Sequence, residues 1–350
     1  MEKTDLIPYV FDDIPAEETP ARRTPTITIL LCAVALLFYG TIAAGYIKEH
    51  RKNERWIVRL LLGDIAGGIG NVYSLPDHDG SVPFICSPDE STGDTSLDRL
   101  ERIRSDGGDS LEVTNNETPY DINMDEIMKM PRAVPKLSEL YAEYGDGAPV
   151  VLIIHTHGTE AYADHADSDY RTDGKDGVIG IGTVIADTLK AEGVNVIHCE
   201  IPFDLPDFTM AYYSAALAIR DYLSEYPSIS YVIDVHRDSI MLPDGSYFAP
   251  VTSVNGESAA KLMFVVGTDY AGSGHVGWRD NLALCARIQS DIGGSVRGMM
   301  RALNLRAASF NEQYTKGSML LEVGSCANTY DEAARAAGIF AHALADEIKG

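Results

Sequence analysis

The sequence predicts an α/β domain built on a largely parallel sheet flanked by helices. Two observations lead to this fold class. Short runs of aliphatic and β-branched residues, typical of buried parallel strands, recur between residues 148 and 350. Segments in which apolar residues repeat with helical periodicity separate these runs. Strands and helices that alternate at this spacing are typical of α/β domains.

The expected elements follow one another from the first buried run to the end of the chain. Strands are expected at 149–154, 194–197, 230–236, 261–266 and 318–323, and helices at 178–192, 209–226, 281–301 and 330–349. In the first of these helices Ile181, Ile185 and Leu189 fall on one face, and Gly193 ends it. The last helix is rich in alanine, which favours helices.

The N-terminal part of the sequence predicts a membrane anchor. Residues 1–23 form a short polar tail, and 24–47 contain no charged residue. This apolar segment has about the length needed to cross a bilayer as a helix. Small residues at 41–45 resemble a cleavage site, but the segment is longer than the apolar region of a usual signal peptide, so we expect an uncleaved transmembrane anchor. Positive residues are more numerous after the anchor than before it, which favours a cytoplasmic C-terminal part.

The composition of residues 48–147 predicts a juxtamembrane segment followed by an acidic, flexible linker. The segment 56–62 can form an amphipathic helix at the membrane surface or extend the anchor helix. From residue 63 onward Gly, Asp, Glu, Ser and Pro are frequent and long apolar runs are few. Short helices are expected at 96–104 and 135–144. The main folded domain is accordingly expected at 148–350.

Composition excludes one class of function. The formal net charge is -24 and the isoelectric point is near 4.6, whereas proteins that bind nucleic acids present basic surfaces to the phosphates. We therefore expect no nucleic-acid partner. The five cysteines show no CxxC spacing, so they are expected to be packing thiols rather than metal ligands or a disulfide framework.

Three of the expected strands end on or near histidine or glutamate, residue types that can bind metal ions. His155, His157 and Glu160 follow the first strand, His236 ends the third, and Glu322 lies near the end of the last. The carboxyl ends of parallel strands meet at one edge of a sheet, where open α/β sheets hold their chemistry. Imidazole and carboxylate are preferred zinc donors, and a catalytic zinc needs three protein ligands and one open position. A lone histidine at a strand end is more often structural, but the repetition of the pattern in three strands predicts a zinc site.

Longer motifs around these residues resemble a known family. They are HTHGTEAY at 155–162, VIDVHRD at 232–238, MFVVGT at 263–268, WRDNL at 278–282 and LLEVGSCANT at 320–329. Together, and in this order, they closely resemble stage II sporulation protein P, a family of membrane-anchored cell-wall hydrolases of endospore-forming bacteria. The resemblance covers nearly all of the expected domain, and the expected anchor and linker agree with it.

The resemblance implies a fold like that of the zinc N-acetylmuramoyl-L-alanine amidases, with a mixed sheet flanked by helices. It implies zinc held by one of His155 and His157, by Glu160 and by His236, with Glu322 as the catalytic base. Glu160 departs from the wider amidase pattern, in which the ligand glutamate comes somewhat later. In the implied mechanism Glu322 accepts a proton from the attacking water and returns it to the leaving nitrogen.

The resemblance also implies a substrate, a location and partners. The substrate is peptidoglycan, cut between the lactyl group of muramic acid and the stem peptide, with an endopeptidase activity on the cross-links between stem peptides. The domain is expected outside the cytoplasm, held at the cell membrane by its single anchor, against the weak indication of the flanking charges. The implied partners are stage II sporulation proteins D and M during engulfment of the forespore.

Four further residues are expected to contact the substrate. Arg171 and Arg237 are suited to grip carboxylates of the stem peptide, although ordinary ion-pair roles are equally expected. His275 lies in a Gly-rich loop, and Asn311 precedes the last strand, where its amide can hydrogen-bond glycan or peptide.

Two other functions remain as alternatives. A catalytically inactive amidase-like module that recruits engulfment partners would not need the complete set of zinc donors that the sequence contains. A zinc hydrolase of a different amide substrate, acting in the cytoplasm, would agree with the charges that flank the anchor.

Overall fold

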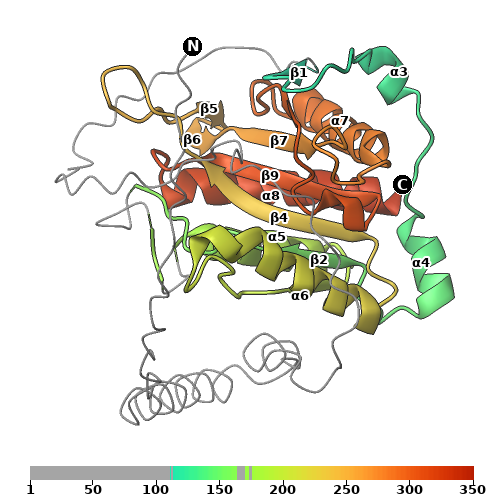
Figure 1. Cartoon of the computed structure of the whole chain (residues 1–350). Coiled ribbons are helices and arrows are strands. Elements are labelled where there is room, and N and C mark those ends of the chain that lie inside the picture. Colours follow the sequence, from blue (N-terminus) through green and yellow to red (C-terminus); the bar gives the residue numbers. More distant parts are fainter. Residues whose placement is uncertain (1–110, 112, 164–169, 173–175) are drawn as a thin grey trace, which may run out of the picture. The chain divides into compact units, whose positions relative to one another are not determined.

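A sheet of seven strands forms the centre of the computed structural model, which describes residues 111, 113–163, 170–172 and 176–350. The strands are β1 (Val113–Thr114), β2 (Val151–Ile154), β3 (Val196–His198), β4 (Tyr231–Asp238), β7 (Leu262–Gly267), β8 (Leu303–Arg306) and β9 (Gly317–Ser325). Their order is β1-β8-β7-β9-β4-β2-β3, and Figure 1 shows β7, β9, β4 and β2 side by side. β7 runs antiparallel to β9, and the other neighbouring pairs are parallel. The prediction of an α/β fold with a mixed, largely parallel sheet is therefore confirmed.

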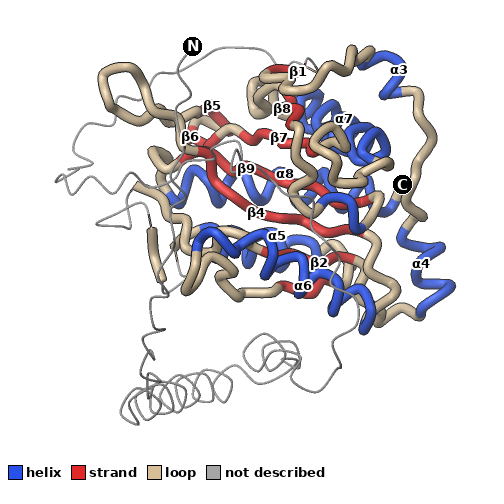
Figure 2. The backbone as a smooth tube through the Cα atoms, viewed as in Figure 1, coloured by secondary structure: helices blue, strands red, loops and turns tan. Residues whose placement is uncertain are grey.

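Helices alternate with these strands along the chain, as the backbone tube in Figure 2 shows. They are α3 (Met124–Met128), α4 (Leu137–Tyr144), α5 (Val178–Ala191), α6 (Ala211–Glu225), α7 (Trp278–Ser295) and α8 (Tyr330–Lys349), with 3-10 turns at η1 (Phe208–Met210) and η2 (Glu312–Tyr314). The helices predicted at 178–192, 209–226 and 330–349 agree closely with α5, α6 and α8. A separate hairpin of β5 (Val251–Val254) and β6 (Glu257–Ala260) was not predicted. Asn255 and Gly256 form its turn with positive φ angles of 52° and 88°, a conformation that Asn-Gly favours.

The segment that follows α7 differs from the prediction. The sequence predicts a helix over 281–301, whereas α7 ends at Ser295 and Gly298 adopts a φ of 80°. This left-handed conformation suits glycine and does not continue a helix. Residues 303–306 then form β8, which pairs in parallel with β7. Four residues that alternate between leucine and polar side chains give only a weak periodic signal beside a long helix.

The two faces of the sheet pack against different elements. In β9, Leu321 and Val323 join the large hydrophobic core, to which α5, α7 and α8 contribute. Leu320 belongs instead to a smaller cluster with Met263 and Phe310, against which α6 packs. Side chains along a strand alternate between the faces, so Glu322 lies on the same face as Leu320. The candidate catalytic residue Glu322 therefore lies on this second face of the sheet.

The C-terminal part of the predicted linker is folded. β1 pairs with β8, and α3 and α4 bring Ile127 and Leu140 into the large core. Arg132 ties the same segment to α8 through an ion pair of 2.9 Å with Glu347. The predicted domain starts only at residue 148, because the apolar residues before it are single and scattered among polar ones, so they show no periodic pattern of a helix or strand. Such residues can still be buried against a core that the rest of the chain has built.

Several predictions fall on residues outside the described part of the chain. These are the tail at 1–23, the anchor at 24–47, the amphipathic segment at 56–62 and the short helix at 96–104. Among the helices that the structure describes, none combines the length and the apolar character that a membrane span requires.

A bulge distorts β9 where it runs beside β4. His236 pairs with Glu322, whereas Asp238 pairs with Ser325, so β9 carries one extra residue between the two pairs. Gly324 lies in this bulge with a φ of 71°. Bulges change the direction of neighbouring side chains and commonly occur beside active sites. Here the bulge follows Glu322 directly and ends its regular pairing with β4.

We expect Gly324→Ala to lower the free energy of unfolding by about 2 kcal/mol, because a residue with a side chain is strained in this conformation. The added methyl group would also lie 2.7 Å from Asn328 Oδ1 and 2.9 Å from Ala260 Cβ. Gly338→Ala is the matched control, since Gly338 lies inside α8 with open space around the added methyl group and alanine favours helices. Urea unfolding followed by circular dichroism measures both variants. A Gly324→Ala variant as stable as Gly338→Ala would contradict this account.

Candidate active site

The two histidines that follow β2 point in different directions. β2 ends at Ile154, and a turn follows at once. The His155 ring lies against Gly182 of α5. Its Nε2 is 2.8 Å from Nε2 of His198 in β3, and its Nδ1 is 3.2 Å from the carbonyl oxygen of Val235 in β4. Burial lowers the pKa of His155 to about 4, so the ring is neutral at pH 7. Both of its ring nitrogens are therefore engaged away from the other predicted ligands.

His157 turns to the opposite side, towards the second face of the sheet. Its ring stacks on Phe208 with centroids 4.4 Å apart and lies edge-on to Tyr212. The ring centroid is 5.4 Å from that of His236. Burial lowers the pKa of His157 to about 4, and its buried Nδ1 has no hydrogen-bond partner. A neutral, buried imidazole with an unpaired nitrogen is suited to bind a metal ion.

Glu160 lies beside these rings and is held by β4. Its Oε2 accepts a hydrogen bond of 3.0 Å from the Arg237 backbone N–H and is 3.6 Å from His236 Nδ1. Burial opposes the charge of the carboxylate, yet the Arg237 guanidinium and the His236 ring lower the pKa of Glu160 to about 2. The side chain is therefore an anion at neutral pH, as a metal ligand must be.

His236 is fixed by a second carboxylate. Its Nε2 lies 3.0 Å from Asp234 Oδ1, although not in the alignment of a hydrogen bond. Asp234 in turn accepts hydrogen bonds of 2.8 Å from the Thr156 N–H and 2.5 Å from its hydroxyl. Burial opposes protonation of His236, but Asp234 and Glu160 hold its pKa well above the usual value. A carboxylate behind a ligand histidine is a common way to orient the ring and raise its basicity.

Glu322 completes the group from the neighbouring strand. It pairs with His236 across β4 and β9, and it is buried with no hydrogen-bond partner for its Oε2. Burial and the nearby Asp238 carboxylate raise the pKa of Glu322 to about 8. A carboxyl group with such a pKa can both hold and release a proton near neutral pH, which is the property of a general acid and base.

These side chains line a pocket of about 140 Å³, which we call the Glu322 pocket. Its lining residues are His157, Glu160, Tyr170, Phe208, Arg237, Asp238, Ser239, Met263, Val265, Asn304, Arg306 and Glu322. Of the predicted zinc ligands and catalytic base, the structure thus brings His157, Glu160 and Glu322 to one pocket, with His236 behind Glu160 at 3.6 Å. It does not bring His155 there.

The donor set fits zinc by its chemistry. Zinc bonds of about 2.0–2.2 Å in a tetrahedral site place neighbouring donor atoms roughly 3.3–3.6 Å apart. The 3.6 Å between His236 Nδ1 and Glu160 Oε2 agrees with that spacing, and His157 Nδ1 is unpaired nearby. Among the described residues no three such side chains already stand in ligand geometry, so a third donor has to reorient on binding. Whether zinc binds, and through which histidine, remains a prediction.

The four residues expected to contact substrate are placed differently. Arg237 lines the pocket, but its Nε donates to the Ala161 carbonyl oxygen and its charge faces Glu160. Arg171 forms an ion pair of 3.8 Å with Asp176. Arg237 is thereby placed to orient a ligand residue, and Arg171 lies next to Tyr170 at the pocket wall.

His275 and Asn311 do not reach the pocket. His275 is buried, and its Nε2 lies 3.1 Å from Asn281 Oδ1, so its Gly-rich loop covers it instead of presenting it. The Asn311 amide donates a hydrogen bond of 2.9 Å to the Tyr212 carbonyl oxygen. Asn311 therefore holds the backbone of Tyr212, whose ring contacts His157, and neither His275 nor Asn311 lines the Glu322 pocket.

Four residues on the far side of the pocket were not among the predicted site residues. Asn304 and Arg306 come from β8, and Met263 and Val265 come from β7. The alternation of Asn304 and Arg306 with two leucines is a period-two pattern that could have indicated a strand. Asn304 and Arg306 reach the pocket because β8 pairs with β7, and the spacing of residues in the sequence does not reveal this pairing.

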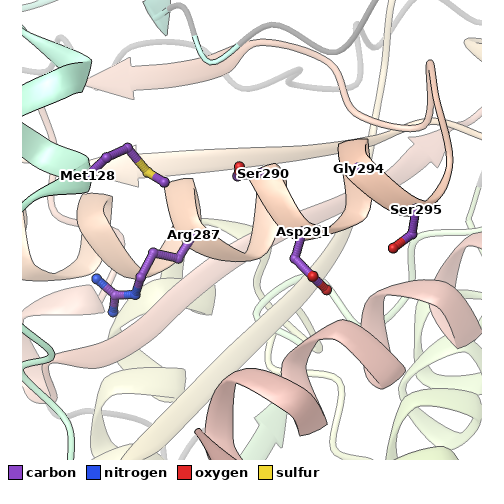
Figure 3. A pocket seen from close by; sticks show the side chains of 6 residues that line it. All are labelled: Met128, Arg287, Ser290, Asp291, Gly294 and Ser295. Atoms are coloured by element: carbon purple, nitrogen blue, oxygen red, sulfur yellow. The ribbon is translucent and has the colours of Figure 1, made fainter.

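A second hollow of about 380 Å³ lies on α7 beside α3 (Figure 3). Its lining residues are Met128, Arg287, Ser290, Asp291, Gly294 and Ser295. The Arg287 guanidinium is already paired with Glu347 at 2.9 Å. This hollow offers neither a histidine nor a cysteine, and we place the chemistry of the described residues in the Glu322 pocket.

The chain is similar to known proteins in sequence. The sequence model of the family described as stage II sporulation protein P (SpoIIP) matches residues 92–345. Stage II sporulation protein P of Bacillus subtilis (strain 168) is 23% identical over 212 residues, which cover 56% of this chain and 50% of that protein. The chain therefore spans about half the length of this curated relative.

Solved structures with partial similarity include several N-acetylmuramoyl-L-alanine amidases. The catalytic domain of CwlV from Bacillus (Paenibacillus) polymyxa var. colistinus is 13% identical, with a TM-score of 0.34, over 57% of this chain and 98% of that one. The amidase from Clostridium difficile 630 is 14% identical, with a TM-score of 0.34, over 58% of this chain and 95% of that one.

Proposed function

The chain belongs to the stage II sporulation protein P family, and on this premise we propose that it is a zinc-dependent peptidoglycan hydrolase. The observation that carries the proposal is the Glu322 pocket. His157 and Glu160 line it together with Glu322, whose pKa is raised to about 8, and His236 lies behind Glu160 at 3.6 Å. Such a set, drawn from β4, β9 and the loop after β2, supports metal-assisted hydrolysis of an amide.

In the proposed site His157, Glu160 and His236 hold zinc. When bound, zinc supplies a Lewis acid that polarises the amide carbonyl and lowers the pKa of water to about 7. Asp234 orients the His236 ring, and the Arg237 backbone N–H orients Glu160. Glu160 and His236 thus each have a polar neighbour, whereas His157 is held by its stacking on Phe208.

Glu322 is the proposed general base. Its carboxyl group accepts a proton from the attacking water and delivers it to the nitrogen of the leaving amine. Burial keeps bulk water from competing for this proton, and the Asp238 carboxylate nearby favours the protonated form. The proton that Glu322 takes from water thus ends on the leaving amine, and the hydroxyl group ends on the acyl carbon.

The proposed substrate bond is the amide between muramic acid and the stem peptide, with endopeptidase action on cross-links as a second activity. We further propose that the segment 24–47 anchors the chain in the cell membrane with the domain outside the cytoplasm. Septal wall degradation during forespore engulfment, with stage II sporulation proteins D and M as partners, is the proposed setting.

The purified protein is expected to release stem peptides from isolated peptidoglycan and to lose this activity on treatment with a chelator. Mass spectrometry of the products identifies the bond, because an amidase frees the N-terminal amine of the stem peptide and an endopeptidase separates cross-linked stems. Added zinc should restore the activity. A folded protein that holds no metal and releases no peptide would refute the hydrolase and favour the recruiting module. Cleavage of other amides alone would favour the different zinc hydrolase.

A further inference from the structure

The Glu322 pocket continues well beyond the proposed zinc ligands. Its lining includes residues of four neighbouring strands, β4, β9, β7 and β8. Neighbouring strands lie about 4.8 Å apart, so three such steps separate β4 from β8 by roughly 14 Å. An extended peptide spans about 3.3–3.6 Å per residue, so this distance corresponds to about four residues. The lining strands thus span the length of a short peptide, of which the pocket of about 140 Å³ would enclose only a part.

Strand register places the side chains at its far end on the same face as Glu322. Asn304 of β8 pairs with Val265 of β7, and Val265 pairs with Leu320 of β9. Paired residues point to the same side of a sheet, and residues two apart in one strand do so as well. Asn304 and Arg306 therefore lie on the Glu322 side, with apolar Val265 between them and the proposed catalytic base.

Asn304 has an unmet hydrogen-bonding capacity. Its side chain is 6% exposed, it lines the pocket, and its buried Oδ1 has no partner. Buried polar atoms are nearly always paired, so an unpaired oxygen that faces a pocket marks a place where water or a ligand supplies the donor. The backbone N–H of a peptide is such a donor.

Arg306 brings a positive charge to the same end of the pocket. Its side chain is 15% exposed, and its Nε lies 3.1 Å from Glu117 Oε2. A guanidinium has five N–H donors, of which one carboxylate engages at most two. The Glu117 side chain is 37% exposed, and its backbone N–H donates a hydrogen bond to the Leu305 carbonyl oxygen of β8. The remaining donors suit a second carboxylate, presented from within the pocket.

We propose that Asn304 and Arg306 form a distal subsite that binds the carboxylate end of a peptide about four residues from the scissile amide. Asn304 accepts a backbone N–H and Arg306 pairs with the terminal carboxylate, while the apolar floor contacts the side chains between. The subsite rests on the proposed hydrolase function, and it adds a length and charge requirement for the substrate.

The test compares two synthetic substrates with the full chain. One is an N-acetylmuramoyl tetrapeptide with a free terminal carboxylate, and the other is the same compound with a terminal carboxamide. We expect kcat/KM to be about tenfold higher for the carboxylate, since charged hydrogen bonds outweigh neutral ones. Arg306→Gln should bring this ratio close to one, and Arg306→Lys should retain part of it. Arg335→Gln, which removes an ion-paired arginine at 2.7 Å from Glu257 outside the pocket, should keep the full ratio.

Binding of the free tetrapeptides, measured by calorimetry, separates the two proposals. Wild type should bind the carboxylate form about tenfold more tightly than the carboxamide, and Asn304→Ala should weaken both forms by about fivefold. Discrimination in binding without any cleavage would support the subsite and refute the hydrolase. Cleavage of both substrates at equal rates, with equal binding, would leave the hydrolase and overturn the subsite. An Arg306→Gln variant that keeps the tenfold ratio would also overturn it.

Discussion

Glu322→Gln is expected to reduce the rate of stem-peptide release by about 100- to 10,000-fold, the range in which a general base contributes. Glutamine preserves the size of the side chain but cannot accept the proton of water. Because His157, Glu160 and His236 are untouched, the variant should bind zinc as wild type does. Release rates from isolated peptidoglycan, together with zinc content by elemental analysis, measure the two properties separately.

Glu322→Asp provides the matched control for this prediction. Aspartate keeps the carboxylate but withdraws it towards β9, so activity should lie between that of wild type and Glu322→Gln. A Glu322→Gln variant with wild-type activity would assign the proton transfer to another group. Loss of zinc together with activity would instead indicate that Glu322 is itself a ligand.

His157→Gln is expected to weaken zinc binding by at least about 100-fold and to abolish hydrolysis with it, because even residues behind the ligands commonly contribute 10- to 100-fold. His155→Gln is the matched variant two residues away. The amide of that variant can still hydrogen-bond His198, and His155 lies outside the Glu322 pocket, so zinc content should remain close to that of wild type. Titration with a competing zinc indicator measures both affinities.

The reverse result would be informative. If His155→Gln lost the metal and His157→Gln kept it, the loop after β2 would have to rearrange on binding, and the pocket as described would not be the metal site. Thermal unfolding of both variants distinguishes loss of a ligand from loss of the fold, since both side chains are buried.

The strands that carry the site were predictable because burial on both faces leaves a continuous apolar signature. The runs before His155, around His236 and around Glu322 form β2, β4 and β9 as expected. The sequence does not separate His155 from His157, because two residues two apart share a face while a strand continues. Because β2 ends at Ile154 and the chain turns there, this alternation no longer applies, and His157 points to the other face.

The far end of the pocket was unpredictable for a different reason. β8 is short, and Asn304 and Arg306 reach the pocket through pairing with β7, a contact between segments far apart in sequence. Burial of His275 was also hidden, because glycine-rich composition suggests an exposed loop and does not show that Asn281 lies beneath it. Composition likewise indicated a linker where Ile127 and Leu140 reach the core.

The position of β9 governs when the site is assembled during synthesis. β9 is the last strand of the sheet in sequence, yet it lies between β4 and β7, which are made earlier. Before it is added, β1, β8 and β7 have no strand that joins them to β4, β2 and β3. Parallel and long-range strand pairings form slowly, because the loop between the strands must first be closed at an entropic cost. The strand that carries Glu322 is therefore the one that joins the two halves of the sheet. In a growing chain the other pocket residues are already synthesised, but the pocket is complete only when β9 inserts.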